Sequence, residues 1–379
     1  MTEIFDPSSI TTWISLSAAA LLLIAFIART VINSKIAEKL IKKDTYSLLK
    51  SIIFKTFWIV LVIVIIAGLI SIIEIFVNNK MKKVAEQIQK SEQMLHDWSL
   101  IEDEQKESAL ESLKQATNEF ESYENLMLYA TALGNQGRFN EALNSYNQAL
   151  TYKKTKELFL NKGIAEQSLG KLEDAKTSLH LALTTQSGMP NKTIFDGKAL
   201  FNLSTIFIEE FQVDNLNKNL LDSALFFFSQ AELKLNQQSK MMGELYSQKA
   251  LVYEFLKDYD NAEKFYIKAI NVKTELAYTN EEIMSLAITN NNAATLLLKT
   301  GYIEDAIRYS EEAIFIFNNA KNYNYLGYAY YTYAEAHEKI ERYDLATKYY
   351  KKARESFNIS GVLTYDDKIS KKLNELRKK

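Results

Sequence analysis

Cysteine is absent from this 379-residue sequence, and proline and glycine are scarce, at two and eleven residues. The absence of cysteine excludes disulfide bonds, thiolate catalysis and cysteine-ligated metal sites. Proline and glycine interrupt helices, so a long chain with so few of them is typical of a mostly helical protein. Alanine, leucine, glutamate, lysine and glutamine, which favour helices, are plentiful. The fold class is therefore predicted to be all-α.

A strong net charge is also lacking, since the formal charge of the whole chain is −2. Residues 1–83 hold ten of the 45 basic and five of the 47 acidic side chains, a balance of +5. The remainder of the chain therefore carries −7. Binding to nucleic acid needs a basic face that displaces counterions. The mildly acidic remainder thus predicts no nucleic-acid partner.

Two long uncharged runs lie near the N-terminus, at residues 10–28 and 56–73, and apolar residues continue to 77 beyond Glu74. About 20 such residues are needed to cross a bilayer. Trp13 and Trp58 each lie near one end of a run, as interfacial tryptophans do. Two buried core helices are the alternative, although soluble helices of this length normally have a polar face. The sequence predicts a transmembrane hairpin over residues 1–83, with spans at about 10–28 and 56–77.

The basic loop between the spans, residues 29–55, predicts the orientation of the hairpin. It contains seven lysines and arginines, whereas the tail before the first span has none and the segment just after the second has four. Short loops rich in lysine and arginine stay in the cytoplasm. We expect an integral protein of the cytoplasmic membrane, if bacterial, with both termini and the soluble part outside. The loop itself is either a helix on an anionic leaflet or a solvated connector.

A pattern recurs six times in the rest of the chain. Two alanines stand seven residues apart, with a third position between them, four residues after the first, that is large in five of six units. This spacing places the three side chains on one helix face. The alanine pairs are Ala142/Ala149, Ala175/Ala182, Ala224/Ala231, Ala262/Ala269, Ala306/Ala313 and Ala346/Ala353, and the residues between them are Tyr146, Leu179, Phe228, Tyr266, Ser310 and Tyr350.

Each unit also has an upstream helix that ends in a turn. A small residue precedes the first alanine by 12 residues in five units and by 20 in the third, which carries extra residues around 212–219. Seven residues after this small residue, the regular units have Gly137, Gly170, Lys257, Gly301 and Glu341. Glycine tolerates a positive φ and suits the end of a helix. Each unit is therefore predicted to be a helix, a short turn and a second helix.

The series resembles the tetratricopeptide repeat family, most clearly at residues 128–149, 244–272 and 292–313. The resemblance implies an α-solenoid of about six helix pairs over residues 123–360. The units are expected near 123–156, 156–189, 197–238, 243–276, 287–320 and 327–360. Residues 84–122 are expected to form a helical stalk or a degenerate first repeat. A C-terminal capping helix is expected within 361–379, because repeat arrays need a polar cap over the last apolar face.

The resemblance also implies a ligand groove on the first helices of the units. Asparagine there can pair with a peptide backbone through both a donor and an acceptor. Alternatively, Asn161, Asn202 and Asn292 stabilise the repeat itself, and the tyrosines of residues 323–333 fill the core rather than a groove. The candidate groove residues are Asn161, Asn202, Thr205, Glu254, Asn291, Thr295, Tyr331 and Glu335.

No catalytic signature emerges from the sequence. Its three histidines, His96, His180 and His337, belong to different segments and fit no zinc-binding pattern. No phosphate-binding glycine loop is present, and the carboxylates are scattered over solvated helix faces. We therefore expect no enzymatic activity, no cofactor and no metal site.

Two functions remain after these exclusions. The first is a membrane-anchored scaffold or adaptor that binds a protein or peptide partner on the array. The alternative is a membrane effector or sensor, in which the array senses a ligand and the spanning helices respond; Glu74, at the rim of the second span, is its support. The expected partners are a protein or peptide and the lipid bilayer, with self-association open through the transmembrane or stalk helices.

Overall fold

The computed structural model describes residues 21–24, 26–30, 33, 39, 43–96, 103–186, 192–236 and 239–378. Every regular element in these residues is a helix, as the sequence predicts. The chain divides into two compact units, Met1–Lys90 and Ser91–Lys379.

The first unit contains the predicted membrane hairpin. The first predicted span, 10–28, lies mostly outside the described residues, and its described end belongs to the short apolar helix Leu21–Thr30. The second lies in α3 (Lys43–His96). Within α3, Thr45–Lys82 is the one helix among the described residues that is long and apolar enough to cross a membrane, and an 18-residue stretch of it has a mean hydropathy of 3.1. The C-terminal part of the predicted basic loop is helical from Lys43 onward and continuous with this span.

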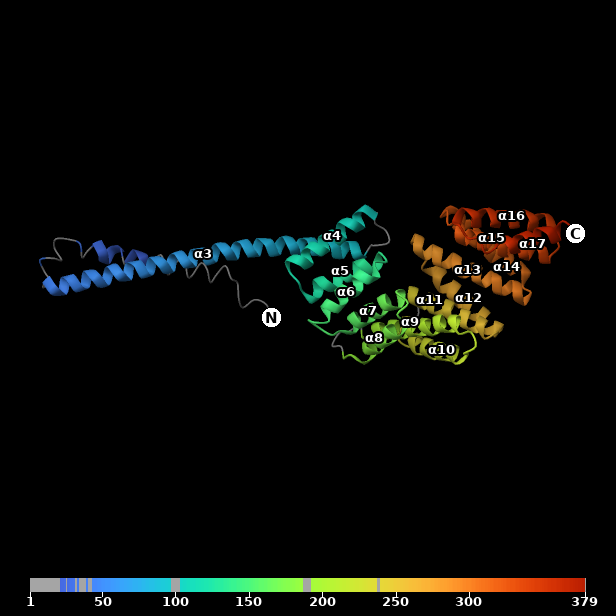
Figure 1. Cartoon of the computed structure of the whole chain (residues 1–379), viewed down its shortest axis with the longest axis horizontal. Helices are drawn as coiled ribbons and strands as arrows, with labels where there is room; N and C mark the ends of the chain where they lie inside the picture. Colours follow the sequence, from blue (N-terminus) through green and yellow to red (C-terminus); the bar gives the residue numbers. More distant parts are fainter. Residues whose placement is uncertain are drawn as a thin grey trace. The chain divides into compact units, whose positions relative to one another are not determined.

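Six helix pairs follow one another in the second unit (Figure 1). The helix α4 (Asp103–Glu119) packs on the first of these pairs and α17 (Asp366–Leu376) on the last. The predicted solenoid of tetratricopeptide-like helix pairs is therefore confirmed. The first helices of the pairs are α5 (Tyr123–Asn135), α7 (Lys156–Ser168), α9 (Lys192–Val213), α11 (Lys240–Phe255), α13 (Asn280–Thr300) and α15 (Tyr323–Lys339). The second helices are α6 (Phe139–Ala149), α8 (Leu172–Thr184), α10 (Asn219–Glu232), α12 (Tyr259–Glu275), α14 (Ile303–Asn319) and α16 (Tyr343–Ser360).

The repeated alanines form the contacts that hold the pairs together. All twelve are at most 1% exposed. A methyl side chain lets two helices approach closely, and the large residue between each two alanines fills the space left between helices. Phe228, Tyr266 and Tyr350 are at most 1% exposed in this position. Ser310, the small exception, is also buried and donates its hydroxyl to the carbonyl of Ala306 at 2.6 Å.

The turn inside each regular pair adopts the backbone conformation that the glycines suggest. Gly137, Gly170 and Gly301 have φ values of 74°, 71° and 94°. Lys257 and Glu341, at the same position of their units, have φ values of 62° and 60° although they carry side chains. The turn geometry is thus set by the repeat and not by glycine alone.

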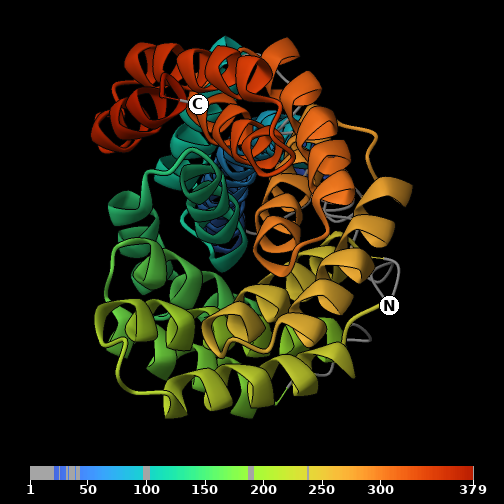
Figure 2. The same cartoon turned by 90° about the vertical axis from the view of Figure 1, so that its right-hand side faces the viewer.

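Contacts between pairs decide which side of the array is the inner one. First helices of consecutive pairs approach to within 8 Å between Cα atoms, whereas the Cα atoms of second helices of consecutive pairs do not within the described residues. Second helices meet there through longer side chains, as His180 of α8 and Phe227 of α10 do. An array whose units are closer together on one side bends toward that side, so the first helices line the inner face. In Figure 2 the pairs follow one another around this bend, from green through yellow and orange to red.

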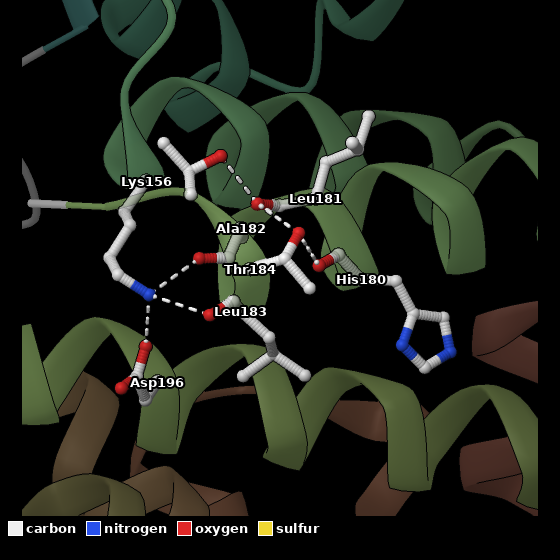
Figure 3. A network of polar contacts seen from close by, with 8 residues as sticks. Lys156, His180, Leu181, Ala182, Leu183, Thr184 and Asp196 are labelled. Carbon is white, nitrogen blue, oxygen red and sulfur yellow. Dashed lines mark hydrogen bonds and ion pairs between the residues drawn. The ribbon is translucent and has the colours of Figure 1, made fainter.

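A buried lysine joins the second pair to the third (Figure 3). Lys156, at the start of α7, is 2% exposed. Its Nζ donates to the carbonyls of Ala182 and Leu183 at 2.8 and 2.9 Å and to Oδ1 of Asp196 in α9 at 2.6 Å. The last carbonyls of a helix have no donor within that helix. Lys156 therefore caps α8 and ties α9 to it.

Gly327 marks the closest approach of α15 to α16. A Cβ added at this glycine would lie 2.6 Å from two ring atoms of Phe357, which is 1% exposed and has no room to move. We expect Gly327→Ala to lower the free energy of unfolding by about 1–3 kcal/mol, the usual cost of overpacking a core. Urea unfolding followed by circular dichroism measures this.

Gly134→Ala in α5 is the matched control, since an added Cβ meets no atom within 4 Å there. Alanine favours the helix over glycine by about 0.5–1 kcal/mol, so this variant should be as stable as the parent or more so. Equal losses in the two variants would show that the contact with Phe357 is not the cause.

Candidate functional site

The inner face contains a cleft near the C-terminal end of the array. Its volume is ≈ 400 Å³, within the range of about 300–1,000 Å³ found for ligand sites. Two consecutive first helices, α13 and α15, form two of its walls, and α17 forms the third. The lining residues are Thr295, Leu298, Lys299, Glu335, Glu338, Lys339 and Lys372.

The repeat itself builds the two main walls. Thr295, Leu298 and Lys299 stand three to four residues apart on α13, which puts them on neighbouring turns of one helix face. Glu335, Glu338 and Lys339 occupy the corresponding positions 40 residues later, on α15. Forty residues is also the interval between the first alanines of these two units, Ala306 and Ala346. The two walls therefore present the same repeat positions side by side.

Ion pairs connect the cleft to the helices around it. Glu338 accepts hydrogen bonds from Lys372 Nζ of α17 at 2.9 Å and from the Tyr350 hydroxyl at 2.8 Å. Lys299 contacts Glu254 of α11 at 3.0 Å and keeps about half of its side chain exposed. Ion pairs this open to solvent contribute about 0–1 kcal/mol. A partner can therefore compete for these ammonium groups at little energetic cost.

Glu335 lies deeper than the lysines. Burial raises the pKa of its carboxyl group, while Lys372 and a hydrogen bond with Tyr331 act in the opposite direction. Burial and the neighbouring Glu335 raise the pKa of the Tyr331 hydroxyl, so this hydroxyl keeps its proton and can act as the donor. The carboxyl group of Glu335 is thus a partly desolvated hydrogen-bond acceptor in the cleft.

Five of the eight candidate groove residues lie in or beside this cleft. Thr295 and Glu335 line it directly. The other three contact residues that line it: Tyr331 bonds to Glu335, Glu254 pairs with Lys299, and the carbonyl of Asn291 accepts the Thr295 hydroxyl at 3.0 Å. Four of the five thus lie at the cleft through their side chains, whereas Asn291 reaches it only through its backbone carbonyl.

The other three candidates, Asn161, Asn202 and Thr205, lie on α7 and α9, and none of them lines the cleft. All three are half-buried. Asn202 donates to the carbonyl of Lys198 at 2.8 Å, one turn earlier. Thr205 accepts a hydrogen bond from Gln167 of α7 at 2.9 Å, which joins two consecutive first helices. Asn202 and Thr205 thus make hydrogen bonds within the repeats.

The sequence reasoning did not select Leu298, Lys299, Glu338, Lys339 or Lys372. The repetition of positions 295, 298 and 299 at 335, 338 and 339 is a signal that could have found the first four. Lys372 had no such signal, because only the packing of α17 brings it to the first helices. Three lysines, Lys299, Lys339 and Lys372, consequently surround one cleft.

Two family models match parts of the chain. Residues 123–156 match a tetratricopeptide repeat. Residues 213–379 match the soluble NSF attachment protein family, SNAP. A search of the curated proteins finds no match. The two models together support a tetratricopeptide-type repeat in the first pair and in the C-terminal half of the array.

One solved structure shares this fold, and another is similar at a lower TM-score. The crystal structure of the apo form of RapI is 16% identical, covers 76% of this chain and 79% of its own, and has a TM-score of 0.53. A tetratricopeptide repeat protein from Parabacteroides merdae is 19% identical and covers 78% of this chain and 99% of its own, with a TM-score of 0.46. Such helical repeat folds are typical of protein-interaction scaffolds that bind protein or peptide partners, and they are generally not enzymes.

Proposed function

We propose that this protein is a membrane-anchored scaffold whose array, residues 123–360, binds a protein or peptide partner along its inner face. The cleft between α13, α15 and α17 is the observation that carries the proposal. An extended peptide segment presents both N–H and C=O groups that need partners. The cleft supplies acceptors on Glu335, donors on Lys339 and an apolar surface on Leu298. It therefore suits a polar segment that is held by several weak contacts.

Blocking the cleft tests this proposal. Thr295→Arg places a long side chain between α13 and α15, and we expect it to reduce the amount of co-purified partner at least tenfold, a loss of about 1.4 kcal/mol or more. The measurement is quantitative mass spectrometry of proteins cross-linked to the intact chain in membranes and purified after solubilisation. A circular dichroism melt of the same sample verifies folding.

Thr131→Arg is the matched control. Thr131 is half-buried on α5, at the same position of the first repeat, one residue after Ala130. It lies outside the cleft, so this variant should capture the partner as well as the parent does. If both variants capture equally well, the partner does not use the cleft and the assignment fails.

The anchor of this scaffold is proposed to be the hairpin of residues 1–83, with two spans, the basic loop in the cytoplasm and the array outside. The apolar, exposed helix Thr45–Lys82 supports one span. Reporter fusions after residue 85 test the orientation: an enzyme active only outside should report, and a protein fluorescent only in the cytoplasm should not. A fluorescent cytoplasmic fusion would reverse the orientation. A chain lacking residues 1–83 should still bind its partner, whereas loss of that binding would favour the sensor instead.

A further inference from the structure

In the first unit, an arginine at the end of the helix Leu21–Thr30 contacts the rings of α3. The guanidinium carbon of Arg29 lies 5.2 Å from the ring centre of Phe57 and 5.9 Å from that of Phe54. These distances are within the roughly 6 Å over which a cation is attracted to an aromatic face. The end of the helix Leu21–Thr30 is therefore fixed against α3.

Lys50 lies on the same side of α3 as these rings. It precedes Phe54 by four residues and Phe57 by seven, so the three side chains share one helix face. The axial rise from Lys50 to these rings is about 6–10 Å. Arg29 and Lys50 have long side chains and are exposed. Both cationic groups can thus approach one anion from neighbouring positions.

Nothing on this stretch of α3 neutralises these charges. No aspartate or glutamate occurs between Asp44 and Glu74, whereas Lys55 adds a third exposed cation beside Phe54. The opposite end of the apolar stretch differs, because Glu74 precedes Lys80, Lys82 and Lys83 there. Only at that end does an acidic residue lie between the apolar stretch and the cations.

The position of these cations along α3 matches the depth of lipid phosphates, provided that the proposed membrane anchoring holds. The uncharged run begins at Thr56, directly after Lys55. Trp58 makes edge contacts with Phe54 and Phe57 at 6.2 and 6.1 Å, which places an aromatic cluster at the start of the run. Tryptophan is enriched at the boundary between the hydrocarbon and the headgroups. Arg29, Lys50 and Lys55 then lie at the level of the headgroups.

We infer that Arg29 and Lys50, flanked by Lys55, form a binding seat for the phosphate of an anionic phospholipid. The guanidinium group can hold two phosphate oxygens at once, and the lysine ammonium contributes a point charge. The rings of Phe54 and Phe57 hold the guanidinium in place before the lipid arrives. This seat fastens the basic end of the hairpin to a leaflet that contains anionic lipid.

Native mass spectrometry of the full-length protein in detergent, with phosphatidylglycerol or phosphatidylcholine added, tests the seat. The parent protein should retain phosphatidylglycerol preferentially. A basic residue near an anionic membrane surface changes affinity about fivefold, so the double variant R29Q/K50Q should bind phosphatidylglycerol about 30-fold more weakly. The control K80Q/K82Q removes two charges at the other end of the same apolar stretch and should change the affinity less than fivefold.

The outcomes separate this inference from the proposed anchoring. Unchanged retention of phosphatidylglycerol by R29Q/K50Q overturns the seat, and so does displacement of the lipid by millimolar inorganic phosphate. Alkaline carbonate extraction of membranes addresses the anchor independently. If both the parent and R29Q/K50Q stay in the membrane pellet, the anchor holds whatever the lipid result. If the parent is extracted, the anchoring fails and the seat with it.

Discussion

Replacing Lys156 by methionine is expected to lower the free energy of unfolding of the array by about 3–5 kcal/mol, the usual cost of removing one partner of a buried ion pair. Methionine keeps most of the apolar length of the side chain but cannot donate hydrogen bonds. The carboxylate of Asp196, which is 18% exposed, then loses its counter-charge. The carbonyls of Ala182 and Leu183 lose their shared donor at the end of α8. Urea unfolding measures the loss, and hydrogen exchange should locate it at α7, α8 and α9.

Two further variants make the result specific. Lys106→Met removes a lysine whose Nζ lies 2.8 Å from Oδ1 of Asp103, an almost fully exposed side chain. The cost of this variant should therefore stay below about 1 kcal/mol. Combining Lys156→Met with Asp196→Leu removes both charges and should recover part of the stability, because no buried charge is left alone. A cost below 1 kcal/mol for Lys156→Met alone would show that solvent reaches Asp196 and replaces the lysine.

Ending the chain at Leu363, which removes α17, is expected to destabilise the last helix pair and to abolish partner binding in the cleft. Ile369, Leu373 and Leu376 are 0%, 8% and 6% exposed. Burying an apolar side chain of this size contributes about 1.5–3 kcal/mol, so the gross loss is roughly 5–9 kcal/mol, partly offset by the regained freedom of the removed residues.

The aromatic contacts of Tyr365 disappear in the same truncation. Its ring lies 4.8 Å from that of Phe357 and 5.2 Å from those of Tyr328 and Tyr331, all on α15 or α16. Loss of these contacts exposes the end of the array, where a repeat protein can unfold locally. Hydrogen exchange should therefore rise first in α15 and α16. Partner binding should fall as well, because Lys372 and one wall of the cleft are gone.

Deleting only residues 377–379 is the control for this truncation. It leaves Ile369, Leu373 and Leu376 in place and should change neither hydrogen exchange in α15 and α16 nor binding. If the longer truncation left α15 and α16 as protected as before, α17 would be a surface attachment and not a cap.

The solenoid was predictable because its core depends on a periodic signal. Alanines at fixed spacing can be found in the sequence without knowledge of any contact, and each of them is buried as that spacing requires. The turns at Lys257 and Glu341 were predictable for the same reason, from their position in the repeat and in spite of their side chains.

Buried polar residues were harder to interpret, because their burial depends on how neighbouring helices pack. Glu166 occupies a first-helix position where the family usually has an apolar group, yet it is 3% exposed. It accepts a hydrogen bond from Ser178 of α8 and pairs with Lys162. His337, 2% exposed, packs edge-on against Tyr333 at 4.4 Å, and burial lowers its pKa so that the ring stays neutral. Lys162 and Tyr333 lie one turn before their partners, as helix periodicity requires. The hydrogen bond from Ser178 and the burial of Glu166 and His337 do not follow from it.

The cleft shows the same limit of periodic reasoning. Two of its walls derive from one repeat position copied 40 residues later, which the sequence displays. The third wall depends on the packing of α17. The ion pairs of Lys299 with Glu254 and of Lys372 with Glu338 depend on side-chain geometry. Five of the eight residues predicted from the sequence lie in or beside the cleft, and periodicity alone does not show where the face is hollow.

The direct contacts between consecutive first helices have a mechanical consequence. Because the backbones of second helices of consecutive pairs lie farther apart than those of first helices in the described residues, the outer side of the array can stretch more easily than the inner side. The spacing of the first helices on the inner side then sets the superhelical pitch of the array. A ligand wedged between α13 and α15 would alter this spacing at one point. Small changes there are multiplied by leverage along the array, so that occupancy of the cleft is converted into movement of its far end.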